Sequence, residues 1–392
     1  MQIKHKILIV HNYYQIPGGE DTVVANEKLL LESNGHQVTL YSRNNSELNN
    51  FSKIQKLLLP ISTVFCFRTY REIRKIIKEH GIDIVHVHNT LNLISPSAYY
   101  AALSFKIPIV QTIHNFRLLC PGATFYRNGQ ICEDCVEHGL LCAARHSCYR
   151  NSKLQTLACV INTKIHRFLR IYEKLNYICL TDFNKEKLLQ LKQIRPERVF
   201  VKPNFVQSIS HVIPYEQREK QFVFAGRIDK LKGIDILLKA WKLMETNAPK
   251  IVICGTGPME DWCKNYISDN DLKSVEMKGF VPNTQVRAII ANSQVLLLPT
   301  QWYEGFPMSI VEAFSAGTPV ITTDLGNAGI LVEEGVTGSK FVADSPEELV
   351  KAVQRIDGYK SISDSTLSAF KIKYTEARNY EYLMKIYDAV KH

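Results

Sequence analysis

The sequence has no hydrophobic run long enough to cross a bilayer, which takes roughly 18–20 apolar residues. The longest candidate stretch, residues 57–67, has 11 residues and contains Pro60. The apolar run at residues 7–10 is too short for a signal peptide. We therefore expect the protein to stay in the cytoplasm, where most of its ten cysteines are reduced thiols or metal ligands.

Short repeats and low-complexity tracts are also absent from the sequence. Hydrophobic residues make up 45% of the 392 residues, and there are 18 Tyr, 17 Phe and 3 Trp. This composition excludes an intrinsically disordered chain, which lacks the apolar residues needed for a core. At about 100–200 residues per domain, the length predicts two domains, or three.

Acidic residues are scarce in the N-terminal half of the chain. Residues 1–204 have 27 Lys and Arg against 15 Asp and Glu, a net charge of +12, whereas the remainder has 21 against 23, a net charge of −2. The whole positive excess therefore comes from the first half. Such a one-sided field attracts anionic partners, for example a lipid surface, a nucleic acid or a phosphorylated substrate.

Short apolar runs alternate with amphipathic stretches throughout the first half. This alternation is typical of βαβ units, in which a parallel sheet is covered by helices on both faces. Strands are predicted at residues 6–11, 37–41, 83–88, 107–113, 177–180 and 198–202, with helices at 21–33 and near 96–105.

The same pattern restarts after a polar stretch at 205–220, which we interpret as a linker. Strands are predicted at residues 221–225, 250–254, 275–278, 295–298 and 320–322, and a helix at 234–244. The predicted fold class is therefore α/β with two parallel sheets. The domains are an N-terminal domain at 1–204, a second at 205–374, and a helix at 375–392 that packs back on the first domain.

Ligands of open α/β sheets bind at the carboxyl ends of the strands, so the loops there form the candidate site. After the first predicted strand, Gly18 and Gly19 precede a helix and let backbone N–H groups approach an anion. A simple turn would explain the same pair of glycines.

Two strand ends in the second half carry glycines, and the first of them also carries basic side chains. Gly226-Arg227, followed by Lys232, suits a diphosphate, because arginine forks onto phosphate oxygens and lysine adds a point charge. The alternative is a solvated charged turn. The next strand ends in Gly255 and Gly257, half of a dinucleotide fingerprint without its third glycine, so hydride transfer is a weak interpretation.

The most specific signal is the segment from Glu304 to Glu312. Pro307 is typical of a helix start, and the free N–H groups of residues 306–309 favour an anion. Glu304, in the loop before this helix, suits sugar hydroxyls, and Glu312, inside it, suits a ribose diol. The alternative for Glu312 is an exposed helical glutamate.

With these motifs in this order, nearly the whole sequence resembles the retaining glycosyltransferases of family 4. The hallmark of that family is two glutamates separated by seven residues. The family also has the Arg and Lys of a GRxxxxKG element, a glycine-rich loop after the first strand, and a histidine after a strand of the N-terminal domain. The matching residues here are Glu304 and Glu312, Arg227 and Lys232, Gly18 and Gly19, and His114.

The resemblance implies the GT-B fold, in which two Rossmann-like domains face each other across an interdomain cleft. It implies transfer of a sugar from a nucleotide-diphosphate sugar to a saccharide or lipid-linked saccharide, with retention at the anomeric carbon. The pathway implied is the assembly of cell-surface polysaccharide or lipid-linked oligosaccharide. No catalytic metal is expected, because two basic side chains can stabilise the departing diphosphate.

The resemblance also implies roles for single residues. Arg227 and Lys232 would hold the diphosphate, Glu312 the ribose, and Glu304 the donor sugar. His114 would lie near the donor sugar and the acceptor, unless it is a buried core histidine. The implied catalytic set is His114, Glu304, Arg227 and Lys232, and the donor-binding set is Gly18, Gly19, Gly226, Gly255, Gly257, Phe306, Pro307, Met308 and Glu312.

Cysteines cluster in an insert at about residues 116–150, directly after His114. Five of the ten cysteines fall within 29 positions there. The spacing of Cys120, Cys132, Cys135 and Cys148 fits a tetrahedral structural zinc site, with Cys142 as the spare thiol. A structureless loop of about 35 residues would be unusual without such a clip. Free thiols, a disulfide and a redox role are the alternatives.

Two basic amphipathic segments favour contact with an anionic membrane surface at the inner face. Residues 51–80 have seven basic residues and two acidic ones, and residues 145–174 have seven and one. Ordinary solvated helix faces would explain the same pattern.

Two other functions remain as alternatives at the level of the sequence. One is a sugar-nucleotide epimerase or a phosphorylase of similar architecture. The other is a zinc-stabilised basic protein that binds nucleic acid, which would leave the segment from Glu304 to Glu312 unexplained. The prediction adopted is a glycosyltransferase without a nucleic-acid partner.

Overall fold

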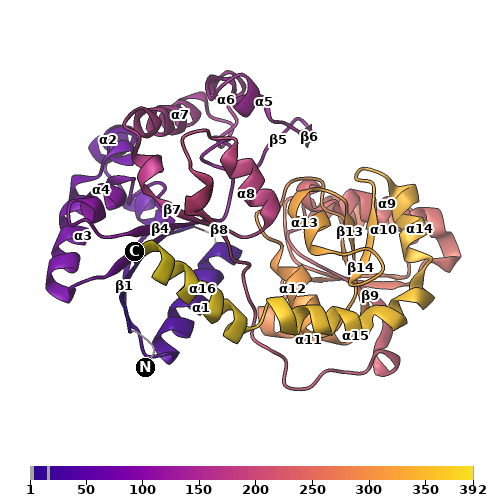
Figure 1. Ribbon diagram of the computed structural model, residues 1–392. Helices are drawn as coiled ribbons and strands as arrows, with labels where there is room; N and C mark the ends of the chain where they lie inside the picture. Colours follow the sequence, from indigo (N-terminus) through magenta and orange to yellow (C-terminus); the bar gives the residue numbers. More distant parts are fainter. Residues whose placement is uncertain (1–3, 16–17, 392) are drawn as a thin grey trace. The chain divides into compact units, whose positions relative to one another are not determined.

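The computed structural model describes residues 4–15 and 18–391. The chain divides into two compact units (Figure 1). The first unit comprises the chain up to Arg127, Cys132–Pro203, and the chain from Asn379 onward. The second unit comprises Asn128–Ile131 and Asn204–Arg378.

The first unit contains a parallel six-stranded sheet with the strand order β2-β1-β3-β4-β7-β8. The middle of β1 is fully buried, as expected for a strand covered on both faces. The order reverses between β1 and β3, which is where ligands of such sheets bind. The strands are β1 (Lys6–Tyr13), β2 (Gln37–Asn44), β3 (Ile84–Asn89), β4 (Ile109–Ile113), β7 (Asn176–Cys179) and β8 (Val199–Val201).

Helices follow the strands of the first unit, as the sequence pattern predicts. The first helix, α1 (Gly19–Ser33), ends before Gly35, whose φ of +83° is left-handed and favours glycine. The helices that follow are α2 (Lys53–Val64), α3 (Phe67–His80), α4 (Ser97–Leu103), α7 (Lys153–Phe168) and α8 (Asp182–Leu189).

The C-terminal helix, α16 (Glu376–Lys391), lies against the first unit rather than the second from Asn379 onward. Its tyrosines hydrogen bond with histidines at the sheet: Tyr380 Oη is 2.8 Å from His36 Nε2, and Tyr387 Oη is 2.7 Å from His86 Nδ1. Tyr387 is fully buried. The helix therefore completes the core of the unit in which the chain began.

The cysteine-rich insert has secondary structure of its own. It contains a two-stranded sheet, β5 (Tyr126–Arg127) with β6 (Gln130–Ile131), and two short helices, α5 (Asp134–Glu137) and α6 (Leu141–His146). Arg127 donates to Asp134 over 2.7 Å. The turn residues Asn128 and Gly129 both have positive φ, so local hydrogen bonds and turn chemistry order this segment.

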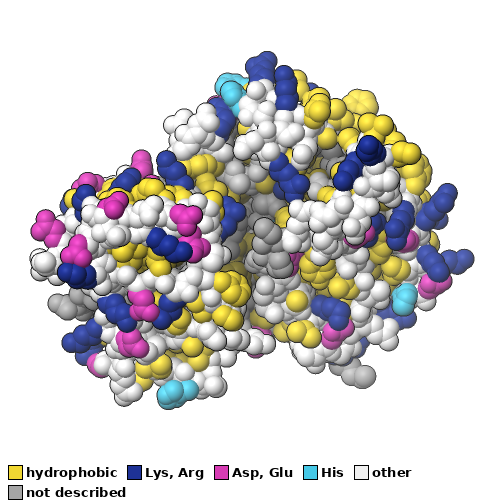
Figure 2. Space-filling view, turned by 180° about the vertical axis from the view of Figure 1, so that it is seen from behind, with side chains coloured by type: hydrophobic (Ala, Val, Ile, Leu, Met, Phe, Trp, Pro, Cys, Tyr) yellow, Lys and Arg dark blue, Asp and Glu magenta, His cyan; other side chains and the backbone are white. Residues whose placement is uncertain are grey.

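The helices α2 and α7 pack together with their apolar stripes facing outward. We call this surface the apolar helix face; it comprises Ile54, Leu57, Leu58 and Ile61 of α2, and Leu154, Leu157, Ile161, Ile165 and Phe168 of α7. Leu57 is 78% exposed and Leu154 is 81% exposed. Figure 2 shows hydrophobic side chains here, at the upper right, interspersed with Lys and Arg. Polar residues, among them Thr63 and Asn162, occupy the buried sides of the same helices.

The second unit contains another parallel six-stranded sheet, with the order β11-β10-β9-β12-β13-β14. Alternate residues of its strands join two hydrophobic clusters, one on each face of the sheet. The strand order reverses between β9 and β12. The strands are β9 (Glu219–Ala225), β10 (Lys250–Cys254), β11 (Val275–Gly279), β12 (Ser293–Leu298), β13 (Val320–Thr323) and β14 (Gly338–Phe341).

Helices cover both faces of this second sheet (Figure 1). They are α9 (Ile234–Met244), α10 (Glu260–Asp269), α11 (Asn283–Ala291), α12 (Met308–Ser315), α13 (Gly326–Leu331), α14 (Pro346–Val353) and α15 (Ile356–Lys373). Two parallel sheets in an α/β architecture confirm the predicted fold class. Within residues 4–15 and 18–391, no helix has the length and apolar character required to traverse a membrane.

Candidate functional site

The strand-order reversal of the second sheet carries an ion pair between two predicted site residues. Lys232 lies in the turn after β9, and Glu304 lies in the loop after β12. Lys232 Nζ is 2.8 Å from Glu304 Oε1, and Thr300 Oγ1 donates to the same oxygen over 2.8 Å. Glu304 is only 4% exposed, so its orientation is fixed by these two contacts.

Asp229, which the sequence analysis did not single out, organises the basic turn. Its Oδ1 accepts a hydrogen bond from the backbone N–H of Lys232 over 2.9 Å, and its carboxylate pairs with the Arg227 guanidinium. The Arg227 side chain is 64% exposed and Lys232 remains partly exposed, so both cations can reach a ligand. The sequence signal for Asp229 is its position, two residues after Arg227 in the same turn.

The glycines of this region allow two loops to approach closely. A Cβ on Gly255 would lie 1.9 Å from the carbonyl oxygen of Gly226, and a Cβ on Gly257 would lie 2.3 Å from that of Ile228. Gly255 also has a φ of +145°. Backbone packing therefore requires glycine at both positions, whatever the loop binds. A Cβ on Gly226 would meet only ordinary contacts.

Glu312 lies on α12 and makes a separate polar contact. Its Oε1 accepts from Asn283 Nδ2 over 2.9 Å, and burial raises the pKa of its carboxyl group. Pro307 is the N-cap of α12, and Met308 is its first residue. The preceding loop is held by Asn327, whose side-chain amide donates to the carbonyl oxygens of Glu304 and Gly305. Phe306 and Met308 pack against one of the two core clusters.

The first unit carries the predicted glycine-rich loop at the N-terminus of α1. Gly18 is the N-cap residue and Gly19 begins the helix. The backbone N–H of Gly18 donates to Asp21 Oδ2 over 3.0 Å, so an acidic side chain of the helix itself already binds there. Burial raises the pKa of the adjacent Glu20 to about 8, although its hydrogen bond from Tyr14 opposes this shift.

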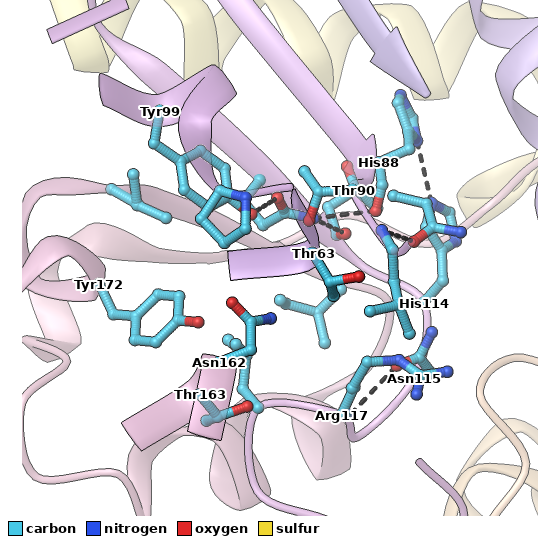
Figure 3. Close-up of a pocket in the computed structure, with 18 residues that line it drawn as sticks. Thr63, His88, Thr90, Tyr99, His114, Asn115, Arg117, Asn162, Thr163 and Tyr172 are labelled. Atoms are coloured by element: carbon cyan, nitrogen blue, oxygen red, sulfur yellow. Dashed lines mark hydrogen bonds between the residues drawn. The ribbon is translucent and has the colours of Figure 1, made fainter. Parts of the chain in front are cut away.

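His114 lines a pocket beside the strand-order reversal of the first sheet (Figure 3). The pocket is partly open to solvent and leaves about 80 Å³ for the centres of water-sized molecules. His114 Nε2 is 2.9 Å from Nδ1 of His88, at the end of β3. Burial, and then the proximity of His88 and His11, lower the pKa of His114 well below its ordinary value. The imidazole is therefore neutral at physiological pH.

Several polar residues of this pocket were missed by the sequence analysis. Thr63 comes from α2, Asn162 and Thr163 come from α7, and Arg117 follows β4. They face the same space as His114, together with Tyr172 (Figure 3). The available signal was the run of polar residues at helical spacing within α7, which is unusual for the buried side of a helix.

The predicted zinc ligands gather in the insert, and all ten cysteines are free thiols. A Cβ on Gly122 would lie within 4 Å of both Cys120 and Cys148, and Cys142 and Cys148 pack against the hydrophobic cluster that contains Cys135. Burial, followed by the neighbouring Cys120, raises the pKa of Cys135 to about 12. Among the described residues, the group with three ligand atoms within 4.8 Å of one another is Glu27, His86 and His88, not the cysteines.

The described structure thus brings the predicted residues into separate groups. Arg227, Lys232 and Glu304 meet around one turn of the second unit, while Glu312 is bonded to Asn283 instead. In the first unit, His114 lies in its pocket.

Family models match both parts of the chain. Residues 17–208 match the model described as "Glycosyltransferase Family 4", and residues 207–357 match "Glycosyl transferases group 1". An uncharacterised glycosyltransferase of Methanocaldococcus jannaschii is 29% identical over 157 residues, which is 40% of this chain and 39% of that protein. An uncharacterised 42.6 kDa protein in the cps region of Klebsiella pneumoniae is 23% identical, over 95% of this chain and 96% of its own length.

Solved structures share the fold across nearly the whole chain. A glycosyltransferase from Rickettsia africae superposes with a TM-score of 0.72 and 16% identity, covering 99% of this chain and 98% of its own. Anabaena HepE in complex with UDP-glucose superposes with a TM-score of 0.64 and 16% identity, covering 98% of this chain and all of its own.

Proposed function

Because the chain is a GT-B glycosyltransferase of the family 4 type, we propose that it transfers a sugar from a nucleotide-diphosphate sugar to an acceptor hydroxyl with retention of anomeric configuration. The observation that carries this proposal is the Lys232–Glu304 pair beside Arg227, at the strand-order reversal of the second sheet. Two cations suit the diphosphate, and a fixed carboxylate suits the hydroxyls of the donor sugar.

In the proposed reaction, the bond between the anomeric carbon and the diphosphate oxygen breaks. The acceptor oxygen bonds to the same face of that carbon, and its proton passes to the departing phosphate oxygen. Arg227 and Lys232 stabilise the negative charge that develops on the leaving group, so no catalytic metal is needed. Catalysis then rests on positioning and electrostatic stabilisation.

The acceptor that we propose is a saccharide or lipid-linked saccharide in cell-surface polysaccharide assembly. The Klebsiella relative in a cps region supports this pathway, and the complex of HepE with UDP-glucose supports a nucleotide-sugar donor. The pocket at His114 offers hydroxyl, amide and guanidinium groups, which suit the hydroxyls of a sugar.

A screen of nucleotide sugars by thermal shift, followed by NMR analysis of the product linkage, tests the proposal. An α-configured donor is expected to give an α-linked product. An inverted product would contradict retention, and interconversion of the free nucleotide sugar would favour an epimerase. Salt-dependent binding of nucleic acid without nucleotide-sugar binding would favour the nucleic-acid alternative.

We further propose that the apolar helix face docks on an anionic lipid surface at the inner face of the membrane. Hydrophobic residues recur at helical spacing on the exposed side of both α2 and α7. Exposed lysines lie on the same helices, among them Lys53, Lys56, Lys153 and Lys164. Each basic residue near an anionic leaflet contributes roughly 1 kcal/mol. The pocket lies beneath the same helices, which would bring a lipid-linked acceptor to His114.

Replacing both Leu57 and Leu154 with glutamate is expected to reduce binding to vesicles that contain phosphatidylglycerol by more than about tenfold, because burying each apolar side chain stabilises by roughly 1.5–3 kcal/mol. Both side chains are exposed, so the fold should persist. Phe280→Glu, at a 78% exposed position of the second unit, is the matched control. Equal sedimentation of the double variant and the control with vesicles would contradict the docking surface.

We also propose a structural zinc held by Cys120, Cys132, Cys135 and Cys148. Cys120 and Cys148 already lie together, and Cys135 and Cys148 share a cluster. Zinc binding would deprotonate the thiols and draw the sulfurs into tetrahedral contact, coupling metal binding to the order of the insert. Since the insert follows His114, such a clip would fix one side of the pocket.

Cys135→Ser is expected to release the metal and to lower sugar transfer more than donor binding. Cys142→Ser, in the same cluster, is the control and should retain the metal. Elemental analysis of protein purified under reducing conditions, without added metal, gives the answer. Less than about a tenth of an equivalent of zinc or iron, with every cysteine titrating as a free thiol, would refute the site.

A further inference from the structure

A buried chain of three side chains leads from the core of the first unit to the pocket. Glu27 lies on α1, His88 lies at the end of β3, and His114 follows β4. Glu27 Oε1 is 3.4 Å from His88 Nε2, and His88 Nδ1 is 2.9 Å from His114 Nε2. Glu27 is fully buried and His88 is 4% exposed, so water does not interrupt this chain.

Glu27 is the member of this series of three side chains that lies farthest from the pocket, and it is ionised. Burial acts to raise its pKa, but Lys202 and then His86 outweigh burial and hold the pKa well below the ordinary value. Lys202 Nζ is 2.9 Å from Glu27 Oε2, and both side chains are 1% exposed. The Lys202 ammonium also donates to Asn379 of α16 over 3.1 Å, so the C-terminal helix helps to position it.

The same carboxylate explains why this cluster is not assigned to a metal. Glu27, His86 and His88 bring three ligand atoms within 4.8 Å. The ammonium of Lys202 already balances the carboxylate charge, and a cation bound beside it would be repelled. The two nitrogens of His86 face Thr112 and Tyr387 at hydrogen-bond distance.

The Glu27 carboxylate decides which ring nitrogen carries the proton in His88 and in His114. Burial, and then His86, lower the pKa of His88 to about 4, and the pKa of His114 is lowered as well, so each ring carries one proton near neutral pH. Glu27 Oε1 and His88 Nε2 lie 3.4 Å apart without forming a hydrogen bond. A lone pair on Nε2 would face the carboxylate charge at this distance and be repelled, so electrostatics places the proton of His88 on Nε2. His88 Nδ1 then has a lone pair and accepts from Nε2–H of His114.

We propose that Glu27 and His88 are positioning residues that fix the tautomer of His114, with its proton on Nε2 and a lone pair on Nδ1. Among the described residues, Nδ1 of His114 has no hydrogen-bond partner and is the ring nitrogen left for a ligand. His114 therefore accepts a hydrogen bond from a hydroxyl group in the pocket. This inference rests on the proposed function for the identity of that group, a sugar hydroxyl.

The test combines ring ¹⁵N NMR of histidine-labelled full-length protein with kinetics. His114→Gln assigns the resonances of His114. In the unsubstituted protein, His114 is expected to show the Nε2–H tautomer. His88→Asn and Glu27→Gln each introduce a side-chain amide, which can donate or accept a hydrogen bond depending on its rotation. Neither variant fixes the proton position of His114, so a mixture of its two tautomers is expected. The kcat for transfer should fall at least about tenfold, with unchanged affinity for free UDP.

His86→Asn is the matched control. It removes a buried histidine from the same strand that lies 3.0 Å from Glu27 and stacks on His88, but the hydrogen bonds of His86 go to Tyr387 and Thr112, not to His114. It should leave the tautomer of His114 unchanged. An Nδ1–H tautomer in the unsubstituted protein, or equal effects of the His86 and His88 substitutions on kcat, would overturn the inference. Because the NMR signature does not require turnover, failure of the proposed function is seen separately, as absence of transfer from any nucleotide sugar.

Discussion

Lys232→Ala is expected to weaken binding of a free nucleoside diphosphate by about ten- to a hundredfold. A charge-assisted hydrogen bond contributes roughly 1.5–3 kcal/mol, and Lys232 is oriented by both Glu304 and Asp229. The substitution also leaves the carboxylate of Glu304 buried without its cation, so a lower Tm is expected. Isothermal titration with UDP and a thermal melt measure the two effects.

Arg227→Ala is expected to weaken the same binding, towards the lower end of that range, because its guanidinium is more exposed to solvent. Lys230→Ala is the matched control, since Lys230 is exposed in the same turn. The control should bind the nucleotide as the unsubstituted protein does. Unchanged affinity in both the Arg227 and the Lys232 variants would refute the assignment of the diphosphate site.

The two glutamates are expected to respond differently to substitution by glutamine. Glu304→Gln should spare binding of the bare nucleotide and lower transfer by about ten- to a hundredfold, because the charge-assisted contact with the donor sugar is lost. Glu312→Gln should weaken binding of nucleotide and nucleotide sugar alike, because it would lose the ribose contact. Titrations with UDP and with the nucleotide sugar, beside initial rates, separate the two roles.

The pH dependence of nucleotide binding gives a second measure of the role of Glu312. Burial raises the pKa of this carboxyl group, so its ionised form is lost on acidification at a higher pH than for an ordinary glutamate. Affinity for the nucleotide should therefore fall as the pH falls through that raised pKa, and Glu312→Gln should remove this step. Identical behaviour of the two variants toward the bare nucleotide would contradict the division of roles.

The sequence by itself determined the fold class, and it predicted candidate site residues that the structure brings together in the second unit. The apolar runs at residues 7–10 and 251–254 are buried, as a short apolar run between amphipathic helices is when it forms the inner strand of a sheet covered on both faces. Lys232 and Glu304 were found because each follows a strand at the carboxyl edge of a sheet. Parallel order brings such loops together whatever their separation along the chain.

Only the tertiary structure decided which side of an amphipathic segment is buried. Residues 54, 57, 58 and 61 form an apolar stripe that a core would normally bury. Here the stripe faces outward, because the opposite sides of α2 and α7 line a polar pocket. The other residues of that pocket come from segments far along the sequence, so the pattern within α2 does not reveal it. The secondary structure of the insert also escaped the sequence pattern, because its elements are too short to show a period.

Only the tertiary structure brings the side chains of Glu27, His88 and His114 into one buried series. The sequence shows a glutamate at a buried spacing of α1 and alternating histidines in β3, and either pattern alone has an ordinary structural explanation. Lys202 and the C-terminal helix complete the network, although Lys202 is 175 residues from Glu27 and 177 from Asn379. Proton positions depend on every partner at once, so the tautomer of His114 follows only from the folded arrangement.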